Sequence, residues 1–193
     1  MGNDKALQLK ISLVHSKPPI WRRVLVHESL TLADLHVVIQ IVMGWENSHL
    51  HDFEMGSERF TEFEEDVQSG ARDSTTVTLR GLGLNRKGRT VTYNYDFGDG
   101  WRHKVFVESS RPAEDSPMLP VCMTGRRACP PEDSGGVHGY EDLLEAVSDP
   151  THPDHDELSE WLDPDFDPEA FDVDRVNRDL RRVFSEGDGP PVN

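Results

Sequence analysis

Residues 90–108 carry the pattern that most constrains the fold. Two strand-like runs flank the turn sequence Phe97-Gly98-Asp99-Gly100. Tight glycine turns between such runs are typical of β-hairpins, and they need Asp and Gly whatever the function. Strict alternation puts the large side chains on one face of each arm: Val91, Tyr93, Tyr95, Trp101, His103, Val105 and Val107. A hairpin of this length predicts an antiparallel sheet with one buried face.

The same reasoning predicts the other elements. Alternating or apolar runs indicate strands over residues 7–13, 20–26, 49–55 and 75–79. Residues 56–74 are polar and are predicted to be a loop, and residues 109–137, which carry Pro, Gly and Cys, are predicted to be an ordered but irregular segment.

Helical spacing indicates one long helix in the first half of the chain and shorter helices after residue 139. The first begins after Thr31, a predicted N-cap with Asp34 three residues later, and ends at Gly44. Shorter patterns cover residues 140–147 and 157–162, and Asp167 is predicted to cap a last helix. We therefore expect one compact α+β domain over residues 1–186, a mostly antiparallel sheet covered by these helices, and a flexible tail over residues 187–193.

Charge and composition exclude several classes of protein. The net charge is −16, and residues 141–193 hold seventeen acidic residues against four arginines. An acidic surface of this kind repels nucleic acid and favours basic partners or cations. No apolar run reaches the roughly 20 residues that span a bilayer. The N-terminus lacks the zones of a signal peptide, and Cys122 and Cys129 are the only cysteines, so we expect a cytoplasmic protein.

A His/Asp group is the first candidate for chemistry. In the predicted strand 49–55, His49 and His51 face the same way, and His103 lies on a hairpin arm that could approach them. With Asp96 or Asp99 of the turn, these side chains could hold a divalent metal ion, zinc or manganese. Ordinary hydrogen-bonded core or surface histidines, and ordinary turn aspartates, explain the same residues without any metal.

The second candidate is the segment from Cys129 to Tyr140. Three potential zinc ligands, Cys122, Cys129 and His138, lie in or near it, although the cysteine spacing is longer than the usual CxxC. A Cys–His nucleophile pair is a further alternative, as are two inert buried thiols. A helix starting at Gly139-Tyr140 would direct its amides toward an anion. The whole predicted cleft comprises His49, His51, Asp96, Asp99, Trp101, His103, Cys129, Glu132, Asp133, His138 and Tyr140.

The order of four stretches resembles one known family. They are PPIWRR at residues 18–23, the 32–45 helix running into HLHDF at 49–53, YDFGDGWRH at 95–103, and CPPEDSGGVHGY at 129–140. Together they resemble the plasmid pRiA4b ORF-3-like family over about residues 6–184. This resemblance implies a single α+β domain, a bacterial or archaeal origin, and a frequent association with plasmids or mobile elements. It implies no established reaction and no catalytic assignment.

Three functions follow from these patterns. The first is a binding or regulatory protein that uses the polar His/Asp cleft for a ligand or protein partner. The second is a metal-dependent hydrolase in which His49, His51 and an Asp hold the ion and a metal-bound water attacks the substrate. The third is a regulator that binds a basic protein through residues 141–193. No P-loop, GxGxxG, GxSxG or HExxH motif is present, which disfavours the enzyme classes that use them.

Overall fold

A computed structural model describes residues 4–116 and 118–184 of the chain. Its centre is an eight-stranded sheet in the order β5-β4-β3-β6-β7-β1-β2-β8. All neighbours are antiparallel except β4 and β5. The strands are β1 (Lys5–Leu13), β2 (Trp21–His27), β3 (His51–Met55), β4 (Glu58–Thr61), β5 (Arg72–Asp73), β6 (Thr90–Tyr95), β7 (Trp101–Pro112) and β8 (Val121–Arg126).

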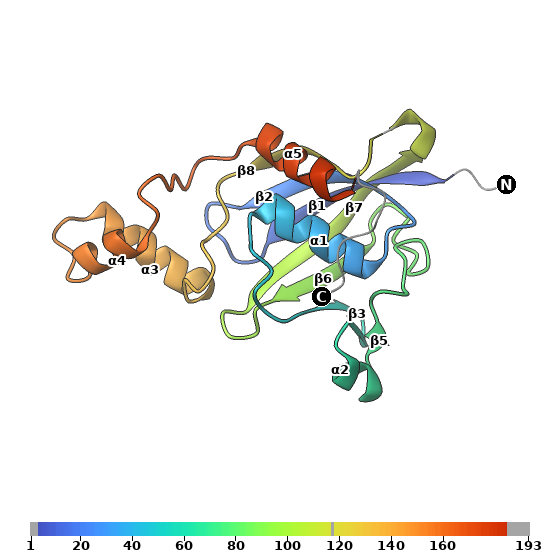
Figure 1. The fold of residues 1–193 in the computed structure, drawn as a ribbon, viewed down its shortest axis with the longest axis horizontal. Helices are drawn as coiled ribbons and strands as arrows, with labels where there is room; N and C mark the ends of the chain where they lie inside the picture. The colour runs from blue at the N-terminus through green and yellow to red at the C-terminus, as the bar shows by residue number, and fades with distance from the viewer. Residues whose placement is uncertain (1–3, 117, 185–193) are drawn as a thin grey trace.

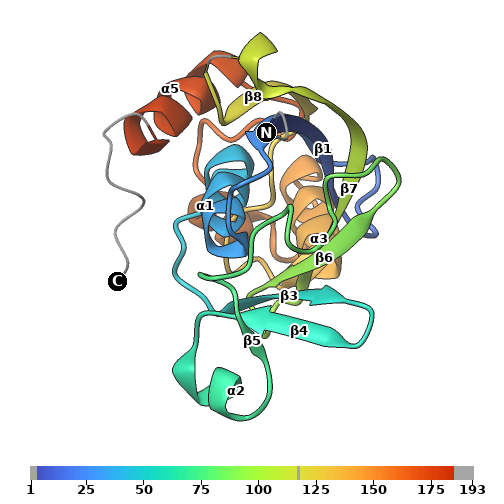
Figure 2. The same ribbon diagram turned by 90° about the vertical axis from the view of Figure 1, so that its right-hand side faces the viewer.

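The helices are unevenly distributed around this sheet. They are α1 (Leu32–Met43), α2 (Glu64–Gln68), η1 (Ala113–Asp115), α3 (Gly136–Ser148), α4 (His155–Trp161) and α5 (Val173–Phe184). Figure 2 shows α1 lying over the sheet, with α5 beside β8. Figure 1 shows α3 and α4 together at the left-hand end, away from α5. The predicted α+β class with a mostly antiparallel sheet is confirmed, whereas the predicted tail over residues 187–193 lies outside the described residues.

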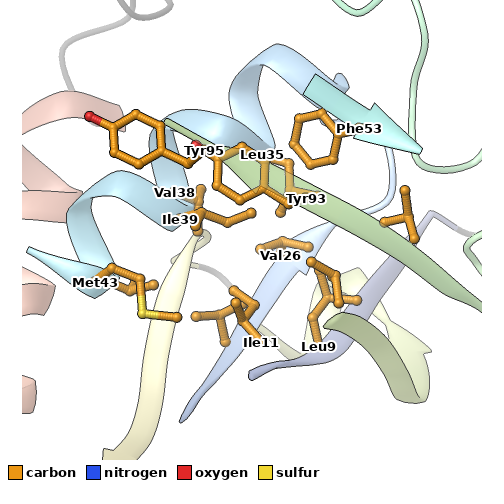
Figure 3. Close-up of a cluster of buried hydrophobic side chains, with 14 of the residues drawn as sticks. Leu9, Ile11, Val26, Leu35, Val38, Ile39, Met43, Phe53, Tyr93 and Tyr95 are labelled. Atoms are coloured by element: carbon orange, nitrogen blue, oxygen red, sulfur yellow. The ribbon is translucent and has the colours of Figure 1, made fainter. Parts of the chain in front are cut away.

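Helix α1 and the sheet enclose the main core. Thr31 caps the helix in a capping box with Asp34, and Gly44 ends it in the left-handed conformation, as predicted. Figure 3 shows Leu35, Val38 and Ile39 of this helix against side chains of β1, β2, β3 and β6. The predicted inward faces of β6 and β7 are both buried. Burial of this continuous apolar face is the main favourable contribution to folding.

A buried arginine joins α1 to the sheet. Arg22 is 1% exposed and donates hydrogen bonds to the carbonyl oxygens of Trp21, Val42 and Arg126. These carbonyls belong to β2, the last turn of α1 and β8. The Phe171 ring lies 4.1 Å from the guanidinium and covers it. A positive charge here is favoured by the negative end of the α1 dipole.

Several predicted boundaries were wrong. Strand β3 begins at His51, so His49 lies in the preceding loop. Residues 75–79 form no strand beyond an isolated bridge between Thr31 and Thr78. The last helix starts at Val173, because Asp167 closes a local turn onto Glu169 N while Asp172 accepts from the first helical amides.

Two segments predicted to lack regular secondary structure contain strands or helices. Residues 56–74 form β4, α2 and β5, and the 109–137 segment contains β8. Helix α3 starts at Gly136 rather than at Gly139-Tyr140, so the predicted anion site at that point is wrong. Within the described residues, no helix combines the length and apolar character needed to cross a membrane.

Candidate functional site

The tip of the β6–β7 hairpin positions the first acidic side chain of the site. Asp96 follows β6 with a φ of 53°, a left-handed conformation that Asp tolerates better than most residues. Its Oδ1 accepts a hydrogen bond from Gly98 N at 2.9 Å, and its own amide donates to Leu50 O. One carboxylate oxygen therefore stabilises the turn, which leaves Oδ2 for another partner.

The loop after α1 brings His49 to this turn. Ser48 N donates to the Tyr95 hydroxyl at 3.0 Å, and the His49 ring packs edge-on against the Tyr95 ring. His49 Nε2 lies 3.8 Å from Asp96 Oδ2 and 3.3 Å from Asp133 Oδ1. This nitrogen is shielded from solvent and forms no hydrogen bond. It faces two carboxylates without a hydrogen-bonded partner.

The loop over residues 129–135 supplies the third side chain. Trp45 Nε1 donates to Pro130 O, and Gly135 N donates to Asp99 Oδ2, so both ends of the loop are held in place. A Cβ atom on Gly136 would overlap Asp99 O, which shows how closely the loop approaches the hairpin. Asp133, with a φ of 59° and a side chain 71% exposed, then projects beside His49.

These three segments create one group of potential metal ligands. Ligand atoms of His49, Asp96 and Asp133 all lie within 4.8 Å of one another. It is the one group of three or more His, Cys, Asp or Glu side chains found at such distances in residues 4–116 and 118–184. His49 and Asp96 were predicted as metal ligands, whereas Asp133 was predicted for the cleft and not for the metal.

His51 and His103, the other two predicted metal ligands, lie in the core instead. The His51 ring stacks on His36 at 3.5 Å, and burial lowers the pKa of His51 to about 3. His103 is fully buried under Trp45 and Tyr93, and burial lowers its pKa to about 3 as well. The predicted four-residue group is therefore wrong for these two residues, since alternation directs both into the covered face of the sheet.

The remaining cleft residues have different environments. Trp101 and Tyr140 are buried and serve packing, and His138 has a side chain 94% exposed on α3. Burial raises the pKa of the Cys129 thiol to about 12 and that of Cys122 to about 11. Protonated thiols are poor nucleophiles. The ligand atoms of Cys122, Cys129 and His138 also do not lie within 4.8 Å of one another, and no hydrogen bond joins either thiol to a histidine in the described residues, so neither the cysteine–histidine zinc site nor the Cys–His nucleophile pair is formed.

Glu132 fastens the loop to the rest of the site. Its carboxylate accepts hydrogen bonds from Glu46 N at 3.0 Å, Ser48 Oγ at 2.5 Å and the Tyr95 hydroxyl at 2.6 Å. Burial and the hydrogen bond to Glu132 raise the pKa of Tyr95 to about 12, so its hydroxyl stays protonated and donates. Glu132 is thus an anchor that keeps His49 and Asp133 adjacent.

A cavity adjoins the group of ligands. Its volume is about 500 Å³, and Trp45, Glu132 and Asp133 line it together with Trp161 and Phe166. We call it the Trp45 cavity. The part played by Trp161 and Phe166 could not be predicted from the sequence, because both lie after residues 129–140 in the chain and approach that segment only in the folded protein. Asp133 belongs both to the cavity wall and to the ligand group.

Comparisons with known proteins agree with this fold. The family model described as "Plasmid pRiA4b ORF-3-like protein" matches residues 5–175. The uncharacterized protein y4hQ of Sinorhizobium fredii (strain NBRC 101917 / NGR234) is 39% identical over 175 residues, 89% of each chain. The crystal structure of MM3350 from Methanosarcina mazei Go1, a protein of unknown function, aligns with a TM-score of 0.81. It is 38% identical and covers 90% of this chain and 98% of that one. The chain belongs to the plasmid pRiA4b ORF-3-like family.

Proposed function

We propose that the protein binds a divalent metal ion through His49, Asp96 and Asp133, and that the metal helps to hold a ligand in the Trp45 cavity. The convergence of these three side chains from three separate segments carries the proposal. One imidazole nitrogen and two carboxylate oxygens form a donor set that suits zinc or manganese. A metal ion held by only three side chains also keeps free coordination positions, which a molecule bound in the Trp45 cavity could occupy.

Electrostatics supports a cation at this point. A neutral His49 would direct either a lone pair or a single N–H at two carboxylates that carry two negative charges. A protonated His49 would offset one of these charges, as in a simple ion pair. A divalent ion offsets both, and it also gives the shielded Nε2 atom a partner. A divalent metal ion therefore offsets more of the negative charge of Asp96 and Asp133 than a proton on His49 does.

Binding is better supported than hydrolysis. A metal-dependent hydrolase commonly uses a carboxylate near the metal as a base for the attacking water. Glu132 is the acidic residue next to Asp133, but its two oxygens already accept three hydrogen bonds that hold the loop. The hydrolase hypothesis also required His51 as a metal ligand, but this side chain is buried against His36. We also propose a regulatory role in the cytoplasm, linked to plasmids or mobile elements. The word plasmid in the family description supports the link to plasmids.

Metal titration of chelator-treated protein tests the proposal. We expect isothermal titration calorimetry with zinc or manganese to give about one equivalent of metal bound. A thermal unfolding measurement should show a higher melting temperature for the metal-bound protein. The Asp133→Asn variant should bind at least tenfold more weakly, because it removes an exposed ligand without disturbing the fold. The matched control is Asp163→Asn, which removes a carboxylate of the same cavity outside the ligand group.

Two outcomes would contradict metal binding. One is wild-type protein that binds neither ion at millimolar concentration and shows no thermal shift. The other is equal weakening in the Asp133→Asn and Asp163→Asn variants, which would indicate diffuse attraction to an acidic surface. Either result would leave His49 and the two aspartates as an ion pair with a structural role.

A further inference from the structure

Helices α3 and α4 form a pair with its own small groove. His155 Nδ1 hydrogen-bonds to Ala146 O at 2.9 Å, which joins the start of α4 to α3. Leu143 is buried beneath the pair, and Leu158 packs against the core at its margin. A cavity of about 330 Å³ lies between the helices, and we call it the α3–α4 groove. Figure 1 shows the two helices side by side at one end of the molecule.

The groove combines an apolar floor with an acidic rim. Leu143 and Leu158 line it, and so does Trp161, which is 48% exposed and is one of the few large apolar side chains on the surface. Asp142 of α3 and Glu157 of α4 line it from opposite helices. Neither carboxylate has a cationic partner within 4.0 Å in the described part of the chain. An exposed indole beside unpaired carboxylates is a setting that attracts cations.

The surrounding charge is of one sign. Residues 141–172 contain thirteen Asp and Glu residues and no Lys or Arg. All four basic residues that follow lie on α5, at a distance from this pair of helices (Figure 1). A potential of this sign raises the local concentration of positively charged partners and speeds their association.

We propose that the α3–α4 groove binds a lysine side chain from a basic segment of a protein partner. The four methylene groups would lie along Leu143, Leu158 and the Trp161 ring, and the ammonium would sit between Asp142 and Glu157. Lysine is suited to such a groove because its stem is apolar while its head remains charged. The many other carboxylates of residues 141–172 favour a partner with several positive charges over a single free amine.

The lysine-binding proposal does not require the metal, although Asp133 and Trp161 line both the α3–α4 groove and the Trp45 cavity. Of the three proposed metal ligands, only Asp133 lines the groove. Asp142 and Glu157 do not belong to the group of ligand atoms that lie within 4.8 Å of one another. We expect a His49→Ala variant to keep its affinity for a basic peptide. Loss of metal binding and loss of peptide binding can therefore be observed separately.

The test uses a fluorescein-labelled peptide of four lysines alternating with glycines, measured by fluorescence anisotropy with the full-length chain. The same peptide with acetylated lysines should not bind. We expect Asp142→Asn/Glu157→Gln to weaken binding at least fivefold. The control Glu145→Gln/Glu160→Gln removes equal charge from exposed positions of the same helices outside the groove, and it should change affinity less than twofold.

A neutral substitution separates the groove from the charge around it. Trp161→Ala leaves the net charge unchanged and should still weaken binding at least threefold, with an unchanged circular dichroism spectrum. Equal affinity of wild-type and Trp161→Ala protein, or equal loss in the two double variants, would overturn the proposal. Spermidine that binds the groove while the lysine peptide does not would also overturn it, in favour of a free polyamine.

Discussion

Gly136 controls how closely the 129–135 loop approaches the hairpin. Its φ is 73°, and an added Cβ would overlap Asp99 O. We expect Gly136→Ala to lower the free energy of unfolding by about 2–4 kcal/mol, from a left-handed alanine and from overpacking together. The same shift should weaken metal binding, because Asp133 would move away from Asp96. Urea denaturation and zinc titration measure the two effects.

Gly88 offers a matched control for this prediction. It also has a positive φ, of 88°, but an added Cβ would meet nothing within 4 Å. Gly88→Ala should therefore cost only about 1–2 kcal/mol, from the backbone conformation alone. If both variants lose the same stability, close packing at Gly136 is not what positions the loop.

Sequence reasoning identified His49, Asp96 and Asp133 but grouped them incorrectly. The HLH sequence predicted that the His49 and His51 side chains point to the same face of one strand. This would be correct only if that strand contained both residues. The strand starts at His51, so the alternation does not extend to His49. Asp133 joins the group through the contact between Gly136 and Asp99, and no local pattern encodes a contact over such a distance in the chain.

At the scale of elements, α5 covers the open edge of the sheet at β8. Asn177 accepts a hydrogen bond from Cys122 N at 2.7 Å and donates one to Cys122 O at 2.8 Å, so its amide continues the ladder beyond β8. Unpaired edge groups favour association with other chains, and covering them prevents it. The Asn177 side chain of α5 thus supplies the hydrogen-bond partners of Cys122 N and Cys122 O at an edge where no further strand pairs with β8.

Removal of this amide tests its role. We expect Asn177→Ala to destabilise the protein by about 1–3 kcal/mol, because a partly buried donor and acceptor lose their partners. The variant should also aggregate faster on heating, as light scattering would show. Arg178→Ala, at a neighbouring exposed position, should change stability by less than about 0.5 kcal/mol. Similar losses in the two variants would mean that Asn177 is dispensable for covering the edge.

The strongest periodic elements were predicted from the sequence, and the irregular ones were not. The 90–108 hairpin and the helix from Thr31 to Gly44 follow local patterns and their own caps. Strand β8 was not predicted, because Pro and Gly residues surround it in the sequence and a bulge interrupts its pairing with β2. Its pairing depends on tertiary partners, namely β2 and Asn177, and such context outweighs local preference.

The whole molecule has a stability that depends on neutral histidines in its core. Burial lowers the pKa of His36 to about 4, and that of His51 and His103 to about 3. The His36 ring nitrogens form hydrogen bonds with Asn47 Oδ1 at 2.8 Å and with the Tyr93 hydroxyl at 2.7 Å, and the bond to Asn47 only partly opposes the effect of burial on the pKa. In the unfolded chain all three would have a pKa near 6.5. The unfolded state therefore binds more protons at any pH between these values.

The sign of the pH dependence follows from this difference. Their contribution to stability is fully present above pH 6.5 and is lost as the pH falls to about 4 for His36 and to about 3 for His51 and His103. Each histidine contributes about 1.4 kcal/mol per pH unit in that range, so the three together give up to about 4 kcal/mol between pH 7.5 and 5.5. Urea denaturation at a series of pH values should show this decline.

Substitution of one histidine separates this effect from the titration of surface groups. His51 stacks on His36 and contacts Phe63, and its Nε2 atom forms no hydrogen bond, so phenylalanine removes the titrating group without removing a hydrogen bond from that atom. His51→Phe should reduce the slope of stability against pH by about a third. His138→Gln, which changes an exposed side chain, should leave the slope as it is. An unchanged slope in His51→Phe would mean that His51 takes up its proton without unfolding the protein.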